Sequence, residues 1–429
     1  MSTLTHSGFS WSAHECQRIA QEALELCQVL VRTNTANPYS GDPNPGGEAA
    51  GQAVIRSWLA ETGAAITEFE PPSDIYARMG VTGPEQRQFE GRPNLVAEWQ
   101  FGSGIGPRIL LQGHMDTVGT QDMTIEPFSG TISNGRIWGR GASDMKGGLA
   151  AAVAAVRAVR RHTDGLNGSL VLLSVVDEEC DGIGAGALAC LDRGYRGDVV
   201  ICVDGTGPTI HVGCNGVVTA KVRLRGRGGH AAGRSTTPNA LVRALAVAQA
   251  INAFGDERHE SVGVGVNLGV FRAGSHHSAM PTTAELAVNI SYTLAEAKES
   301  HSSGEGYGGH LVKNAFAQTV KAADAQAELE WVKDAIPFDP LQSDHPEILA
   351  LQQAQRTMLG TLPSVAPFYA WSDACYQSYL GGMPTLIFGA GTPNAAHSPE
   401  EYNEIERITG CAQALTGYLY SRLGGSRED

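Results

Sequence analysis

Three short apolar runs, each followed by acidic residues or histidine, dominate the hydrophobic pattern of the chain. They occupy residues 108–116, 169–179 and 198–204, and their length and composition predict strands that are buried on both faces. Between the first two runs, the alanine-rich segment 146–161 predicts a helix. A strand, a crossover helix and a second strand predict parallel pairing, so the polar strand ends should meet at one edge of a mainly parallel sheet.

A change in texture marks a second unit within this α/β pattern. The outer parts of the chain carry predicted helices at 13–32 and 48–62, a loop at 37–47 and a strand at 384–389. The middle part carries alternating strands and helices, predicted at 217–225, 237–253, 285–292, 311–325 and 328–333. We therefore expect an α/β domain made of residues 1–213 and 337–429, with a smaller α+β lid domain, residues 214–336, inserted into it.

The composition narrows the class of protein. A chain of 429 residues with a net charge of −14 and a pI near 5.4 lacks the clustered basic residues that bind nucleic acid. The sequence offers no apolar run of membrane-spanning length, and its N-terminal segment does not resemble a signal peptide. The eight cysteines show no paired spacing, which is typical of reduced thiols. These features favour a cytoplasmic enzyme or binder of small molecules.

Histidine and carboxylate side chains gather at the predicted strand ends. They are His114, Asp116, Asp144, the pair Glu178–Glu179, Asp204 and, in the loop after the last strand, His397. Imidazole and carboxylate without thiolate favour zinc, manganese or cobalt, and a shared carboxylate can hold two such ions about 3.5 Å apart. Of the two adjacent glutamates, one can bind metal while the other acts as general base. One such acid alone would be an ordinary solvated residue, but the whole set predicts a site for one or two divalent ions.

Five sequence motifs carry a resemblance to a known family. They are Gly113-His-Met-Asp-Thr-Val, Gly139-Arg-Gly-Ala-Ser-Asp-Met-Lys-Gly-Gly, Asp177-Glu-Glu, Gly228-Gly-His-Ala, and Gly389-Ala-Gly followed by Ala396-His-Ser-Pro-Glu-Glu-Tyr. Through them the chain resembles, nearly end to end, the metallopeptidase family of aminoacylase, acetylornithine deacetylase, succinyl-diaminopimelate desuccinylase and glutamate carboxypeptidase. The resemblance implies a metal-dependent hydrolase that cleaves a C–N bond of a small molecule, by amide deacylation or dipeptide cleavage.

The resemblance also implies the metal ligands. One ion would be bound by His114 and Asp204, the other by Glu179 and His397, and Asp144 would bridge the two. In this family the peptide bond after the bridging acid is often cis, which is here the bond to Met145.

Three further roles follow from the same resemblance. Asp116 would orient His114, and Glu178 would be the base that deprotonates the attacking water and later protonates the leaving nitrogen. His230, in the inserted domain, would reach the active site of a partner subunit and stabilise the oxyanion, which implies a homodimer built through that domain. His276 and His277 are expected to be ordinary loop residues.

The chain departs from the family where an amino-acid carboxylate is usually bound. Ser278 and Ser291 stand where the family commonly has asparagine and arginine, and serine cannot replace the planar fork of an arginine. Either Arg272 or Arg234 supplies the positive charge, or the substrate is not a standard N-acyl amino acid.

Aromatic residues near the last metal loop leave a second reaction open. They are Phe368, Tyr369, Trp371 and Tyr376, and such clustering is usually core packing. If two of them face the site, a flat substrate fits, and the chain could be an aminohydrolase that releases ammonia from an aromatic amine, as the family's nitroanthranilate aminohydrolase does. A non-catalytic binding protein on the same fold is the third alternative, which the intact ligand set and Glu178 disfavour.

Overall fold

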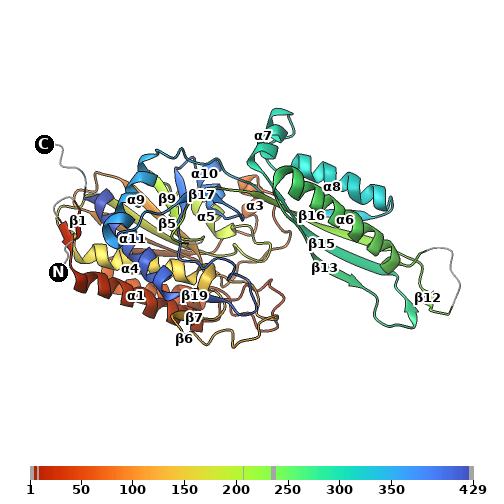
Figure 1. Ribbon diagram of the computed structural model, residues 1–429, viewed down its shortest axis with the longest axis horizontal. Coiled ribbons are helices and arrows are strands. Elements are labelled where there is room, and N and C mark those ends of the chain that lie inside the picture. Colours follow the sequence, from red (N-terminus) through yellow and green to blue (C-terminus); the bar gives the residue numbers. More distant parts are fainter. Residues whose placement is uncertain (1–3, 7–8, 206, 233–237, 425–429) are drawn as a thin grey trace.

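Two lobes lie side by side along the long axis of the molecule (Figure 1). The computed structural model describes residues 4–6, 9–205, 207–232 and 238–424. The larger lobe is built on an eight-stranded sheet, and the smaller one on a four-stranded sheet formed entirely by residues between 216 and 335.

The eight-stranded sheet has the order β17-β10-β18-β9-β5-β8-β4-β3. Its strands are β3 (Ala65–Phe69), β4 (Asn94–Phe101), β5 (Arg108–His114), β8 (Gly168–Val175), β9 (Val199–Cys202), β10 (Ile210–Cys214), β17 (Val365–Phe368) and β18 (Thr385–Ile387). The central strands β8, β5, β9 and β18 pair in parallel, whereas β4 and β3 add on antiparallel. The predicted parallel arrangement of the three apolar runs is therefore confirmed.

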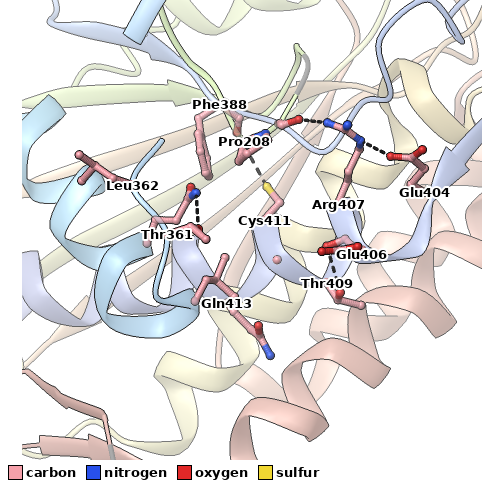
Figure 2. Close-up of a pocket in the computed structure, with 15 residues that line it drawn as sticks. Pro208, Thr361, Leu362, Phe388, Glu404, Glu406, Arg407, Thr409, Cys411 and Gln413 are labelled. Carbon is pink, nitrogen blue, oxygen red and sulfur yellow. Dashed lines mark hydrogen bonds and ion pairs between the residues drawn. The ribbon is translucent and has the colours of Figure 1, made fainter. Parts of the chain in front are cut away.

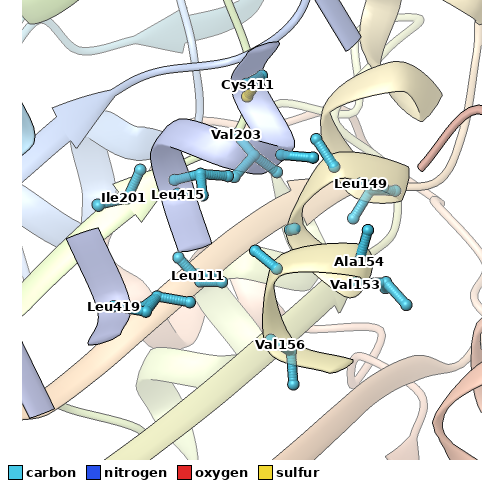
Figure 3. Packing of buried hydrophobic residues seen from close by; sticks show 14 of the residues in the cluster. Leu111, Leu149, Val153, Ala154, Val156, Ile201, Val203, Cys411, Leu415 and Leu419 are labelled. Carbon is cyan, nitrogen blue, oxygen red and sulfur yellow. The ribbon is translucent and has the colours of Figure 1, made fainter. Parts of the chain in front are cut away.

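Helices cover both faces of this sheet. One face is covered by α1 (Ala13–Arg32), α4 (Gly147–Arg161), α9 (Pro346–Leu359) and α11 (Ile405–Leu423), and the other by α3 (Ile75–Met79), α5 (Ala185–Asp192) and α10 (Ala374–Tyr379). Leu111 of β5 packs with Leu149 and Val153 of α4 and with Leu415 of α11 (Figure 3), while its neighbour Leu110 belongs to the core on the opposite face. Successive side chains of a strand point to opposite faces, so a strand buried on both sides is apolar throughout.

The smaller lobe is an antiparallel sheet covered by helices. Its strands, in the order β13-β15-β11-β16, are β13 (Val266–Ala273), β15 (Thr283–Tyr292), β11 (Gly216–Arg225) and β16 (Glu328–Ala335). The helices are α6 (Ala240–Val262), α7 (Leu294–Ser302) and α8 (His310–Ala323), and their apolar residues form a separate core with those of the sheet. The predicted start of the first helix, at 237, lies outside the described residues. An α/β lobe with a smaller α+β lobe confirms the predicted fold class.

The two lobes are joined by a few direct contacts. Trp371 Nε1 donates to the carbonyl of Ile336 at 3.1 Å, and the backbone N–H of Asp334 donates to the carbonyl of Thr82 at 3.2 Å. In the part of the chain that the structure describes, no helix has the length and apolar character needed to cross a membrane. All eight cysteines carry free thiols, and only Cys16 and Cys180 are not fully buried.

Candidate metal centre

The predicted ligands come together at one edge of the large sheet. His114 ends β5, Glu178 and Glu179 follow β8, and Asp204 follows β9. These strands are parallel neighbours, so their carboxyl ends lie side by side. Asp144 comes from the turn before α4, and the peptide bond between Asp144 and Met145 is cis, as the resemblance implies.

Asp144 lies between the two histidines. Its Oδ1 is 3.1 Å from Nε2 of His114, and its Oδ2 is 3.4 Å from Nε2 of His397. The same nitrogen of His397 lies 2.9 Å from Oε1 of Glu179. Each oxygen of one carboxylate thus faces a different imidazole, which is the arrangement needed by an acid shared between two ions.

Two overlapping groups of side chains could hold an ion. His114 forms one with Glu178 and Glu179, and Asp144 forms the other with Glu179 and His397, with the ligand atoms of each group within 4.8 Å of one another. Among the described residues, Asp204 belongs to neither group, although it is buried and the charge of Asp144 raises its pKa.

The raised pKa of the acidic residues indicates that a bound cation would stabilise their charged forms. Burial raises the pKa of Glu178 well above its usual range, and the nearby carboxylates add to the shift. Burial, followed by the charge of Asp144, raises the pKa of Asp204 to about 7. Burial alone would lower the pKa of His114, yet its hydrogen bond to Asp144 and the charge of Glu178 raise it well above normal. Buried carboxylates with imidazole partners are stable as metal ligands, so the donor set fits one or two divalent cations.

Asp116 lies beside His114, with its backbone carbonyl closer to the imidazole than its carboxylate. Nδ1 of His114 lies 2.9 Å from the backbone carbonyl of Asp116, whereas the nearest carboxylate oxygen is 3.7 Å away. That carboxylate accepts hydrogen bonds from the backbone N–H groups of Glu178 at 3.2 Å and Glu179 at 3.0 Å. The carbonyl group orients the histidine, and the carboxylate holds the backbone of the two glutamates.

Glu401 is a buried residue of the site that the sequence did not single out. Its Oε1 accepts hydrogen bonds from the backbone N–H of Ser143 at 2.9 Å and of Asp144 at 3.2 Å, and Arg140 pairs with its Oε2 at 2.7 Å. This carboxylate therefore fixes the turn that presents Asp144. The only signal for it in the sequence is its place in the motif that begins at Ala396.

The residues proposed for substrate and oxyanion lie elsewhere in the single chain. His230 is on β12 (Gly229–His230), which pairs with β14 (Ala279–Met280) at the far end of the smaller lobe (Figure 1), next to Ser278. Arg272 is an exposed residue of β13, 4.0 Å from Glu285. Arg234 lies outside the described residues. One chain therefore does not bring His230, Ser278 or Arg272 to the metal ligands.

The four aromatic residues have different surroundings. Tyr376 is fully buried and Phe368 nearly so, and Trp371 is half-buried with its indole N–H bonded between the lobes. Tyr369 is 66% exposed. Partial burial, followed by the charges of Asp144 and Asp204, raises the pKa of Tyr369, which places its phenol within electrostatic reach of the metal ligands.

A cavity of about 430 Å³ lies away from these ligands. Figure 2 shows it between the start of α11 and the loop after β9, with Pro208, Phe388, Leu362 and Arg407 around it. Arg407 pairs with Glu404 at 2.5 Å and also bonds the carbonyl of Gly207. None of the five predicted ligands lines this cavity.

The fold and the ligand geometry define a metal-dependent hydrolase. The chain matches the profile of Peptidase family M20/M25/M40 over residues 110–421 and belongs to that family. The N-formyl-4-amino-5-aminomethyl-2-methylpyrimidine deformylase of Bacillus subtilis (strain 168) is 25% identical over 439 residues, covering 95% of this chain and 96% of that protein. A probable succinyl-diaminopimelate desuccinylase of Staphylococcus aureus (strain MSSA476) is 26% identical over 381 residues, covering 77% of this chain and 86% of the relative.

A solved structure of the same family has the same fold. The YXEP protein of Bacillus subtilis, a dinuclear metal binding peptidase from the M20 family, superposes with a TM-score of 0.58 at 15% identity, covering 95% of this chain and 99% of that one. The family resemblance and the prediction of a metal-dependent enzyme that hydrolyses C–N bonds are thus confirmed.

Proposed function

We propose that this protein removes the acyl group from a small N-acylated amine that carries an aromatic ring and lacks an α-carboxylate. The observation that carries the catalytic part is the position of Asp144 between His114 and His397, with the half-buried Glu178 beside His114. In this proposal His114 and Asp204 bind one ion, Glu179 and His397 the other, and Asp144 bridges them. Zinc, manganese and cobalt all suit these donors.

In this proposal a bound cation and Glu178 have separate roles in amide hydrolysis. A bound divalent cation supplies a Lewis acid for the amide carbonyl and lowers the pKa of water. Glu178 accepts the proton of the attacking water and passes it to the leaving nitrogen, since both steps need one carboxyl group close to the scissile bond. Burial raises the pKa of Glu178 above its usual range, which favours uptake of the proton from the attacking water.

Three observations support this substrate class. Ser278 and Ser291 offer no guanidinium for an α-carboxylate, and the carbonyl of Ser291 accepts a hydrogen bond from Arg258, whose charge is paired with Glu296. Tyr369 offers an exposed ring near the ligands. A relative that matches nearly the whole chain is a deformylase whose named substrate is an N-formyl aminomethylpyrimidine. A flat N-acyl amine without a carboxylate accounts for all three observations.

We also propose that two chains form a homodimer through the lid domain, residues 214–336. His230 is exposed at the far end of this lobe, and its neighbours there come from β14 of the same lobe. In a symmetric dimer the lid of one chain can reach the active site of the other. There His230 would donate a hydrogen bond to the oxyanion.

A substrate panel tests the proposal. The zinc- or manganese-loaded protein is incubated with N-formyl and N-acetyl arylmethylamines, N-acyl amino acids, dipeptides and nitroanthranilates, and released amine, amino acid and ammonia are measured separately. We expect kcat/KM to be highest for the acylated arylmethylamines. Free amino acid as the main product would restore the standard deacylase or peptidase reading, and ammonia from the nitroanthranilates would support the aminohydrolase instead.

A further inference from the structure

The turn that carries Glu178 and Glu179 has an unfavourable backbone. In this catalytic turn, residues 177–183, the φ angles of Asp177, Cys180, Asp181 and Ile183 lie between 42° and 64°. Left-handed backbone is disfavoured for residues with a Cβ atom, and most of all for β-branched isoleucine. Such a conformation persists only where surrounding contacts enforce it, so the partners of this turn decide where the two glutamates point.

Arg87 makes more of the side-chain contacts to this turn than any other described residue. It comes from the loop between α3 and β4, and it is only 5% exposed. Its Nε lies 3.0 Å and 3.1 Å from the two carboxylate oxygens of Asp177, and its Nη2 lies 2.9 Å from Oδ1. Nη2 also donates to the carbonyl of Cys180 at 2.9 Å and approaches that of Glu179 at 3.4 Å. One guanidinium therefore holds the beginning and the middle of the turn.

The contacts of Arg87 connect to those of Asp116. Asn37, which is fully buried, donates from Nδ2 to Asp116 at 2.8 Å and to Asp177 at 3.1 Å. Arg92 lies 2.6 Å from Oδ1 of Asp177 and also pairs with the buried Glu48. The two guanidinium groups thus pair with the two buried carboxylates of Asp177 and Glu48, which would otherwise be costly to bury.

We propose that Arg87 is a positioning residue for catalysis, which sets the direction of Glu178 and Glu179 through Asp177 and the carbonyl of Cys180. The carboxylate of Asp116 binds the backbone N–H groups of Glu178 and Glu179. Arg87 binds the backbone carbonyl groups of the turn and the side chain of Asp177. The inference rests on the proposed roles of Glu178 as base and Glu179 as ligand. It adds a residue that lies outside all five sequence motifs.

The chemistry of the contact requires arginine. Only a guanidinium offers several N–H donors in one plane, so it can serve a carboxylate on one side and a carbonyl on another. Lysine carries its three N–H donors on one nitrogen, so it cannot reproduce the fork of Nε and Nη2 that spans Asp177 and the carbonyl of Cys180. The ring of Tyr39 lies 3.8 Å from the guanidinium carbon of Arg87 and limits its movement.

A matched pair of arginines provides the test. Arg243 of α6 also binds a carboxylate through two of its nitrogens: Nε lies 2.6 Å from Oδ2 of Asp324, and Nη2 lies 2.5 Å from Oδ1. Like Arg87, it also donates to a backbone carbonyl, which is that of Arg225. Arg87→Ala, Arg87→Lys, Arg243→Ala and Arg243→Lys would be prepared in the full chain and loaded with cobalt. Three quantities are compared: kcat and KM on the best amide substrate, the visible spectrum of bound cobalt, and the thermal unfolding midpoint.

The two sites should respond differently. For both Arg87 variants we expect kcat to fall about 10- to 100-fold and the cobalt spectrum to shift because Glu179 is displaced. Methylguanidine should restore part of the kcat of Arg87→Ala, which a purely structural role would not allow. Both Arg243 variants should lose thermal stability but keep kcat and the spectrum.

Wild-type kcat and an unchanged cobalt spectrum in Arg87→Lys would overturn the proposal, and so would an equal loss of kcat in the Arg243 variants. If Arg87→Ala does not fold, the kcat and the cobalt spectrum of Arg87→Lys provide the test. The spectrum needs no substrate, so a wrong substrate class would not be mistaken for failure of this inference.

Discussion

Lys333 of the smaller lobe forms an ion pair with Asp181 of the catalytic turn, with Nζ 3.3 Å from Oδ1. Lys333 lies near the end of β16, and its side chain is 12% exposed. The pair therefore connects the smaller lobe to the same short segment that carries Glu178 and Glu179. We expect a change in the position of the smaller lobe to act on these two residues through this pair.

Loss of this ion pair should affect catalysis more than stability. In Lys333→Gln we expect the free energy of unfolding to fall by less than about 1 kcal/mol, because Asp181 is 43% exposed and the pair is partly screened. We expect kcat/KM to fall by a few fold at low salt, and the difference from wild type to shrink at high salt. Lys298→Gln, which breaks an exposed pair with Asp339 at 2.9 Å, is the control. Equal effects of the two variants would show that the catalytic turn is not the reason.

Removal of metal should destabilise the protein, because the carboxylates of Asp144, Glu179 and Asp204 then remain close together without a cation. A ligand that binds only the folded state adds about 2.7 kcal/mol of stability when its free concentration is 100 times Kd. We expect the thermal midpoint to rise on addition of zinc or manganese and to fall with a chelator.

The variant Asp204→Asn sharpens this test. Above about pH 8, where the carboxyl group of Asp204 with its pKa of about 7 is charged, the variant removes one negative charge from the site. There the metal-free variant should be more stable than the metal-free wild type, while its gain from added metal should be smaller. Differential scanning calorimetry with and without metal measures both effects. If the metal-free variant were less stable than the metal-free wild type, repulsion between the carboxylates of the site would not be the main effect of removing the metal.

Much of the site could be predicted because its ligands terminate apolar runs. His114, Glu178 and Asp204 each follow a run that must be a buried strand, and parallel pairing brings such ends together. The contacts that support these residues could not be predicted in the same way. Glu401 lies more than 250 positions from Asp144, whose backbone it binds, and Arg87 lies in a loop without periodic pattern. Side chains that meet only through folding leave no local signal.

The fold was predicted less completely at the outer strand of the large sheet and in one helix that covers it. Strand β3 is short and mostly exposed, and it pairs only with β4, so its apolar pattern is weak. No element was predicted over 405–423, where the structure has helix α11 packed against α4. The interior of the sheet is fixed by burial on both faces, whereas an edge strand has fewer contacts to constrain its sequence.

Glu178 should be essential for turnover and unnecessary for folding. In Glu178→Gln we expect kcat to fall at least about 100-fold, because a neutral amide cannot accept the proton of the attacking water. Metal content, measured by atomic emission, and the thermal midpoint should stay close to wild type, since the side chain is not one of the proposed ligands. Asp144→Asn is the comparison: it should lose metal together with activity. Substantial turnover in Glu178→Gln would show that Glu178 is not the general base.

His230 should act on the active site of the partner chain. Sedimentation must first establish a dimer, after which His230→Ala and Glu178→Ala chains are co-expressed with different tags and the mixed dimer population is purified. Each parent should be inactive or nearly so. In a mixed dimer one active site combines an intact Glu178 with an intact His230 from the other chain. One of its two active sites is then complete, so the purified mixed dimer should have about half of the wild-type activity per dimer. Activity no higher than that of the parents would contradict action across the dimer and would leave His230 without a place in the proposed mechanism.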